Sequence, residues 1–312
     1  MTVMDYHKEG KPQIPRPGGP AIIAGIFVSE LILFAFTGSL AVLGIALVTL
    51  LSGVIGVVDD LKTLGGIVKP ALLVLGGLPL VALQYLFPQS MVYDHHLYLP
   101  LFKTPTNIPI IYILLIIVAI PVVTNTINTI DVLNGVVTGT ILIASIPVGF
   151  TLILRYIVGK ENPYALAAFF PFVGATLAFY YFHKYPSKIF PGDSGAMTLG
   201  AAYGTMAIIG GAEVVAVIAI LPAIMNSFFF LSSVKRLVEH RQIKSQPVKV
   251  LDDNTMIATG DPQAPVTLMR LLVGVRAKSE KEIGRDILRL TAYTSLLACL
   301  TAILTWVIPY AK

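Results

Sequence analysis

The chain has 312 residues, of which 55% are hydrophobic and only 12% are charged. Soluble domains carry roughly 25% charged residues, so this composition excludes a soluble globular protein and predicts an integral membrane protein. The apolar stretches run for about 17 to 25 residues, the length of spanning helices. The roughly ten-residue alternating segments of a barrel are missing. We therefore predict an all-α polytopic bundle that forms a single domain over residues 1–312.

The apolar stretches predict about nine spanning helices. In chain order they cover residues 21–37, 40–58, 67–87, 108–123, 136–154, 164–182, 196–211, 214–231 and 287–308. Glu30 lies inside the first of them, and an intramembrane carboxylate has either a function or a hydrogen-bonded place inside the bundle. The sequence leaves both alternatives open.

The positive charges predict how the bundle is oriented. Cytoplasmic loops of membrane proteins are enriched in lysine and arginine. With the amino terminus in the cytoplasm, all but four of the 22 basic residues lie on that side; the four are Lys103, Arg155, Lys160 and Lys312. The net charge of +5 therefore reflects orientation in the lipid bilayer and does not indicate nucleic-acid binding. The short loops favour the cell membrane, and in a eukaryote the same pattern predicts the endoplasmic reticulum membrane.

Three polar clusters interrupt or end the apolar stretches. The first, GVIGVVDD, ends in Asp59 and Asp60; the second is NTINTIDVLNG over residues 125–135, and the third is KYPSKIFPGDSG over residues 184–195. Burying ionised carboxylates in hydrocarbon is costly, so the Asp59–Asp60 pair marks a membrane surface. The predicted orientation puts all three clusters on the cytoplasmic side, where we expect them to converge around one site.

A long cytoplasmic loop over residues 235–284 completes this face. Its VKV and TMIA segments flank Asp252, Asp253 and Asn254, which predicts a short β-hairpin. After Pro265, four apolar residues recur at helical spacing and predict a helix that lies on the membrane surface; they are Leu268, Leu271, Leu272 and Val275.

The side chains of these clusters suit a phosphate-rich ligand. Asp and Asn oxygens favour Mg²⁺, with Mn²⁺ as an alternative, and such an ion bridges and neutralises a diphosphate. Lys69, His240 and Arg241 would supply fixed positive charge, and Phe190 offers a face on which a base could stack. These features favour a soluble diphosphate donor that meets a lipid phosphate. The alternative is a transporter lined by Glu30 and the interfacial aspartates, although the polar residues crowd the inner edge.

Five motifs occur in an order that resembles a known enzyme family. They are KPQIPRPGGP, GVVDDLKTLGG, NTINTIDVLNGVVTG, YPSKIFPGDSGAMTLG and a loop EHR. In this order they resemble the polyprenyl-phosphate N-acetylhexosamine-1-phosphate transferases of glycosyltransferase family 4. Within that family the sequence looks most like the eukaryotic and archaeal UDP-N-acetylglucosamine:dolichyl-phosphate N-acetylglucosamine-1-phosphate transferases.

The resemblance implies a magnesium-dependent transfer of GlcNAc 1-phosphate from UDP-GlcNAc to a polyprenyl or dolichyl phosphate, with release of UMP. It implies that Asp59 and Asp60 are catalytic and that Asn128 and Asp193 bind the metal. The residues implied to bind substrate are Lys69, Asp131, Asn134, Phe190, His240 and Arg241. One-step and two-step mechanisms stay open, and the oligomeric state is open too, a homodimer included.

The sequence also departs from the family pattern. Relatives usually have ten spans, with one helix before the KPxIPxPGG segment, whereas only nine are predicted here. Asp131 follows the bacterial wall-precursor enzymes, while Asn134 follows the eukaryotic pattern. The histidine-rich loop motif of the bacterial enzymes is replaced by His240-Arg241 alone, which argues against a peptide-bearing sugar donor.

Overall fold

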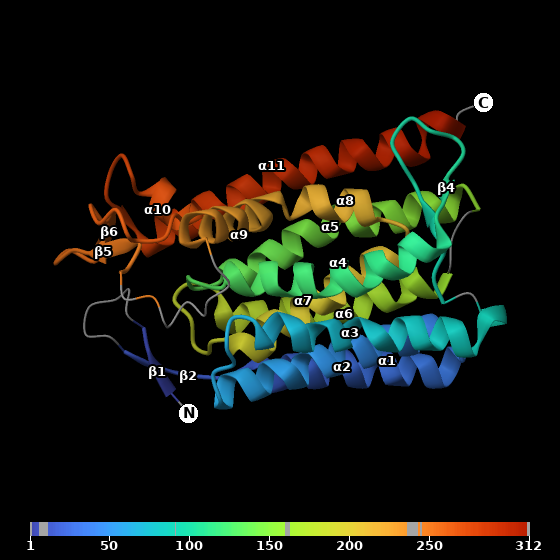
Figure 1. Cartoon of the computed structure of the whole chain (residues 1–312), viewed down its shortest axis with the longest axis horizontal. Helices are drawn as coiled ribbons and strands as arrows, with labels where there is room; N and C mark the ends of the chain where they lie inside the picture. The colour runs from blue at the N-terminus through green and yellow to red at the C-terminus, as the bar shows by residue number, and fades with distance from the viewer. Residues whose placement is uncertain are drawn as a thin grey trace.

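The molecule is a bundle of long helices that run roughly along its longest axis (Figure 1). The computed structural model describes residues 2–5, 12–90, 92–159, 163–235, 243 and 245–310. The helices are α1 (Gly19–Thr37), α2 (Leu40–Leu61), α3 (Val68–Leu86), α4 (Pro109–Thr129), α5 (Val136–Ile157), α6 (Pro163–His183), α7 (Gly192–Ile209), α8 (Glu213–Ala219), α9 (Leu221–Val234), α10 (Leu268–Leu272) and α11 (Glu280–Trp306). The all-α polytopic fold predicted from the composition is thus confirmed.

The predicted number of nine spans is not confirmed. Within the described residues, seven helices are long and apolar enough to cross a membrane, and an eighth span results if α8 and α9 count as one. The segment predicted as one span over 214–231 is bent by 68° between α8 and α9. Pro222 lies at the start of α9, and proline lacks the N–H and clashes with the carbonyl four residues earlier, which breaks a continuous helix.

Helix α7 lies at the centre of the bundle. All of its 18 residues are buried, and it packs against α1, α2, α4 and α5. Its sequence is rich in Gly, Ala and Thr, because neighbouring helices rather than lipid cover every face. At Gly56 of α2, a Cβ atom would lie 2.5 Å from the Cα of Ser194. The two backbones therefore touch where α7 begins, and this contact holds the first turn of α7 in place.

The two ends of the bundle carry different structures (Figure 1). The hairpin of β1 (Thr2–Met4) and β2 (Gln13–Pro15) lies at one end, together with α10 and the sheet of β5 (Val248–Val250), β6 (Thr255–Ala258) and β7 (Lys278–Ser279). At the other end are the carboxyl terminus, the 3₁₀ turns Pro88–Ser90 and Ile308–Tyr310, and the ribbon of β3 (His96–Leu97) and β4 (Thr106–Asn107).

The long loop after α9 contains the predicted hairpin. Strands β5 and β6 pair antiparallel, with Val248 opposite Ala258, and β6 also pairs with β7. The predicted surface helix is shorter than its apolar pattern, because α10 stops at Leu272 and Gly274 follows. Leu268 is buried, whereas Val275 is 99% exposed, so the amphipathic pattern continues beyond the helix that forms.

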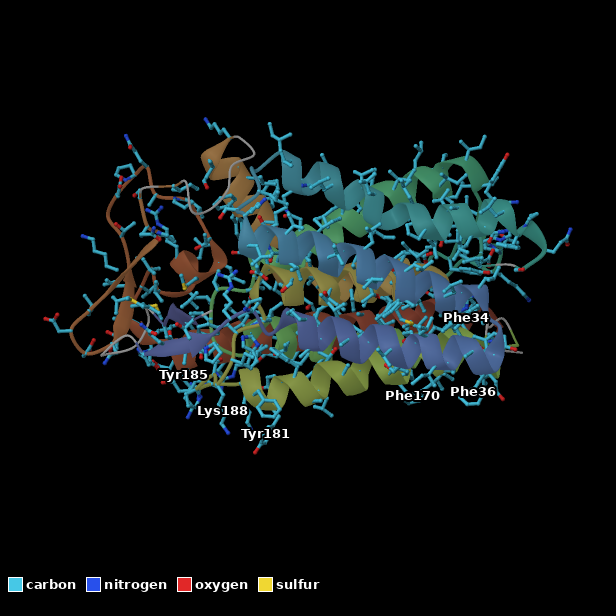
Figure 2. All side chains as sticks on the ribbon, turned by 90° about the horizontal axis from the view of Figure 1, so that it is seen from below. Phe34, Phe36, Phe170, Tyr181, Tyr185 and Lys188 are labelled. Carbon is cyan, nitrogen blue, oxygen red and sulfur yellow. The ribbon has the colours of Figure 1, made fainter. Side chains whose placement is uncertain are left out.

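Aromatic and basic side chains lie on the outer side of the molecule at the end of α6 and in the residues that follow it (Figure 2). Tyr181 points away from the bundle, and the ammonium groups of Lys184 and Lys188 lie 5.0 and 5.5 Å from its ring centre. Aromatic rings and lysines with apolar stems are typical of the membrane–water boundary. This pair of contacts therefore indicates that the boundary runs near the end of α6 that leads into residues 184–191.

Glu30 lies on α1 and is fully buried. Neither of its carboxyl oxygens has a hydrogen-bond partner within the described residues. The alternative in which Glu30 is hydrogen-bonded inside the bundle is therefore not what the structure shows.

Candidate active site

Asp193 contacts side chains from three other parts of the chain. It lies in the first turn of α7, and its Oδ1 atom is 3.1 Å from the Lys69 Nζ of α3 and 3.1 Å from the Asn128 Nδ2 of α4. Its Oδ2 atom is 2.7 Å from the Arg16 Nη2 atom. The predicted convergence of distant clusters is therefore present, with a single carboxylate at its centre.

Asp60 holds the first turn of α7. Its Oδ1 atom accepts the amide N–H of Asp193 at 2.9 Å, and its Oδ2 atom accepts the amide and hydroxyl of Ser194 at 3.0 and 2.6 Å. The first N–H groups of a helix lack partners inside the helix and favour a negative charge. Asp60 satisfies two of them from the end of α2, and this fixes where Asp193 stands.

Asp59 is also buried, on the neighbouring side of α2. Its Oδ1 atom accepts the Leu64 amide at 2.7 Å, and its Oδ2 atom lies 2.6 Å from the Lys69 ammonium. Lys69 therefore bridges Asp59 and Asp193, and its own side chain is 5% exposed. Two carboxylates thus surround this buried lysine.

A cavity of about 770 Å³ lies beside these residues. Its wall contains six of the predicted site residues, namely Lys69, Asn128, Asp131, Asn134, Phe190 and Asp193, together with Arg16 and His183. Asp59 and Asp60 are not among the described residues that line the cavity. Their catalytic role therefore stays a prediction. His240 and Arg241 lie outside the described residues. The volume is within the range typical of small-molecule sites.

Asp131 is the carboxylate whose ionisation the site alters most clearly. Burial raises its pKa to about 7; the charge of Arg16 lowers the pKa, while those of Asp193 and Asp60 raise it. Burial is therefore the main reason that the neutral form of Asp131 is favoured. A cation bound beside Asp131 would lower this pKa.

The donor set fits a magnesium ion that is bound partly by its substrate. Within the described residues, no three His, Cys, Asp or Glu side chains are grouped closely enough to hold a metal ion alone. Mg²⁺ commonly takes only one or two carboxylates and completes its octahedron with water and substrate phosphates. Asp193, Asn128 and Asp131 offer hard oxygen atoms on the wall of one cavity, so they fit such an ion.

Asn134 is held by residues that were not predicted from the sequence. Its amide N–H donates to Glu280 Oε1 at 2.9 Å, and its side chain also donates to Glu280. Its Oδ1 atom accepts the Ser187 amide at 2.7 Å. Glu280 begins α11, and no sequence signal marks it apart from the neighbouring Ser279-x-x-Glu282 capping box. Residues from three distant segments thus fix one side of the cavity.

We predict that Glu280→Ala lowers the unfolding free energy by about 1–3 kcal/mol, because the buried Asn134 backbone N–H loses its acceptor and the Asn134 side chain keeps only Asp5, at 3.3 Å. Glu280→Gln keeps one acceptor oxygen and should lose less. Lys281→Ala is the matched control, since Lys281 is exposed on the same turn. Thermal unfolding in detergent measures the effect, and equal shifts for Glu280→Ala and Lys281→Ala would contradict it.

The fold and the cavity together define a polytopic helical membrane protein with a charged site at one end of its bundle. The family model described as Glycosyl transferase family 4 matches residues 42–211, more than half of the chain. The chain therefore belongs to glycosyl transferase family 4, as the order of its motifs predicts. The matched region contains every predicted site residue except His240 and Arg241.

Curated relatives give the same picture. The chain is 32% identical over 213 residues to a phospho-N-acetylmuramoyl-pentapeptide-transferase of Halalkalibacterium halodurans, covering 65% of this chain and 63% of that protein. It is 30% identical over 210 residues to a protein of Saccharolobus solfataricus, covering 66% and 62%. That protein is provisionally designated a UDP-N-acetylglucosamine–dolichyl-phosphate N-acetylglucosaminephosphotransferase. The matches thus span less than two thirds of the length of these relatives.

Proposed function

We propose that this protein transfers GlcNAc 1-phosphate from UDP-GlcNAc to a polyprenyl or dolichyl phosphate and releases UMP. The observation that carries the proposal is the position of Asp193, which joins Lys69, Arg16 and Asn128 in one cavity. Fixed positive charge beside hard oxygen donors is what a nucleotide diphosphate needs. The designation of the Saccharolobus solfataricus relative supports this choice of donor and acceptor.

In the proposed reaction, an oxygen of the lipid phosphate attacks the β-phosphorus of the donor. The bond between that phosphorus and the bridging oxygen of the UMP group breaks, and the oxygen leaves with the negative charge. The ammonium of Lys69 is placed to stabilise this charge, since it lies at the cavity wall beside Asp193. When bound, Mg²⁺ would neutralise the diphosphate, held by Asp193 and Asn128.

Phe190 and Asn134 are proposed to hold the uracil. Phe190 lies on the cavity wall, and its ring meets the His183 ring edge-on at 6.5 Å between centroids. Its amide donates to Pro15 O at 3.0 Å, and its carbonyl accepts the Gly18 amide at 2.7 Å. The backbone on both sides of the ring is therefore fixed, which suits a stacking platform for a base.

The proposed location of the site is the cytoplasmic edge of the cell membrane. The site lies at the end of the bundle that carries the long basic loop and the amino-terminal hairpin (Figure 1). The positive-inside tendency supports a cytoplasmic position for that end, where soluble nucleotide sugars occur. A lipid phosphate would reach the cavity from the membrane boundary beside α6.

The proposed function predicts that purified protein with Mg²⁺, UDP-GlcNAc and a polyprenyl or dolichyl phosphate releases UMP. A screen of radiolabelled UDP-sugars with the same acceptors identifies the donor, and we expect UDP-GlcNAc to exceed UDP-MurNAc-pentapeptide. Omitting the lipid phosphate is the control. A folded preparation that releases no UMP from any UDP-sugar would contradict the proposal.

A further inference from the structure

Arg16 belongs to the KPQIPRPGGP motif, in which no site residue was predicted, yet it lines the active-site cavity. It lies between β2 and α1, in a segment that pairs with residues 190 and 191. The Phe190 amide donates to Pro15 O at 3.0 Å, and the Gly18 and Gly19 amides donate to the carbonyls of Phe190 and Pro191 at 2.7 and 2.8 Å. This pairing holds Arg16 on the same side as Asp193.

One terminal nitrogen of Arg16 makes both of its ionic contacts. Nη2 lies 3.0 Å from Asp60 Oδ1 and 2.7 Å from Asp193 Oδ2. Within the described residues, Nη1 and Nε have no hydrogen-bond partner. The side chain is 24% exposed and lines the cavity. The guanidinium is therefore anchored at one corner, while its other N–H groups are available to a ligand in the cavity.

Arg16 and Lys69 contact opposite oxygens of the same carboxylate. Lys69 Nζ meets Asp193 Oδ1 at 3.1 Å, and Arg16 Nη2 meets Oδ2 at 2.7 Å. Two fixed cations thus flank Asp193 at the cavity wall. A lysine acts as a point charge, whereas the planar fork of an arginine matches pairs of phosphate oxygens. The arrangement suits an anion with two adjacent phosphates.

We propose that Arg16 binds the diphosphate of the nucleotide donor through the N–H groups that Asp60 and Asp193 leave unused. This inference rests on the proposed function, because it names a residue that holds the donor of that reaction. Asp60 then has a second task, since it orients the guanidinium as well as the first turn of α7.

Binding of UDP and of uridine to the full-length protein with Mg²⁺, measured by titration calorimetry, tests the inference without turnover. Arg16→Lys keeps a positive charge between Asp60 and Asp193, so its thermal midpoint should stay close to that of the unmodified protein. Its Kd for UDP should rise about 10- to 100-fold, because hydrogen bonds to charged groups are lost. Arg16→Gln should lose as much affinity or more, and uridine binding should stay unchanged in both variants.

Arg276→Lys is the matched control, because Arg276 is 65% exposed and pairs with Glu282; it should not affect UDP binding. If Arg16→Lys binds UDP as tightly as the unmodified protein, Arg16 serves only to bridge carboxylates and the inference is wrong. Equal losses for uridine and UDP would overturn it too, since they indicate a collapsed site. An unmodified protein that binds UDP more tightly than uridine but releases no UMP would contradict the proposed reaction and leave the Arg16 inference standing.

Discussion

Asp193→Asn is expected to lower the rate of UMP release about a thousandfold, the upper range for removing one electrostatic group from an active site. The substitution keeps the shape of the side chain but removes the charge that attracts Arg16, Lys69 and any bound cation. Asp59 still pairs with Lys69, and Asp60 still pairs with Arg16, so the fold should persist. Initial rates at saturating donor and acceptor measure the effect.

The control for this variant is Asp252→Asn. Asp252 is exposed in the turn between β5 and β6, at the same end of the molecule. Its removal changes the net charge equally without touching the cavity. Should Asp193→Asn keep more than about a tenth of the activity, Asp193 would not be the centre of the reaction.

Lys69→Met is expected to reduce both stability and turnover. The substitution leaves two buried carboxylates, Asp59 and Asp193, without the ammonium that lies 2.6 and 3.1 Å from them. Removing one partner of a buried ion pair costs about 3–5 kcal/mol, and turnover should fall about a hundredfold or more if the ammonium also stabilises the leaving group. Thermal unfolding and initial rates measure the two effects separately.

A double variant separates the two roles of Lys69. In Lys69→Met with Asp59→Asn, the uncompensated charge of Asp59 is gone, so much of the stability should return. Turnover should stay low, because no ammonium faces the phosphates. Lys62→Met, an exposed lysine at the end of α2, is the control. If the double variant recovers activity together with stability, Lys69 only neutralises Asp59.

Most helices were predictable because apolar length is a direct signal in a membrane protein. The predicted span 136–154 corresponds to α5, Val136–Ile157. The bend between α8 and α9 was not predicted, because the apolar sequence continues through Pro222. Neighbouring helices stabilise the break in the helix at this proline. The central position of α7 was also not predicted, because its burial on all sides depends on which helices surround it.

The site was predictable where its residues stand in polar clusters. Asp59, Asp60, Asn128 and Asp193 interrupt or end apolar segments, and the structure brings them together. Arg16 was not predicted as a site residue, because it lies outside these three clusters and only the fold brings it to Asp193, 177 positions away. The hairpin over residues 248–258 was found from local pattern alone.

The sequence by itself determines that this is a polytopic helical membrane protein whose acidic and amide residues gather at one side. It does so through the order of the apolar segments, the placement of the basic residues and the composition of the polar clusters. These properties depend on local free energies of transfer into lipid, which each segment carries by itself. Only the tertiary structure decided that Asp60 caps α7, that Arg16 and Lys69 share Asp193, and that Glu280 holds Asn134. Those pairings depend on how closely the helices approach one another. The packing of the complete bundle sets these distances, so no single segment encodes them.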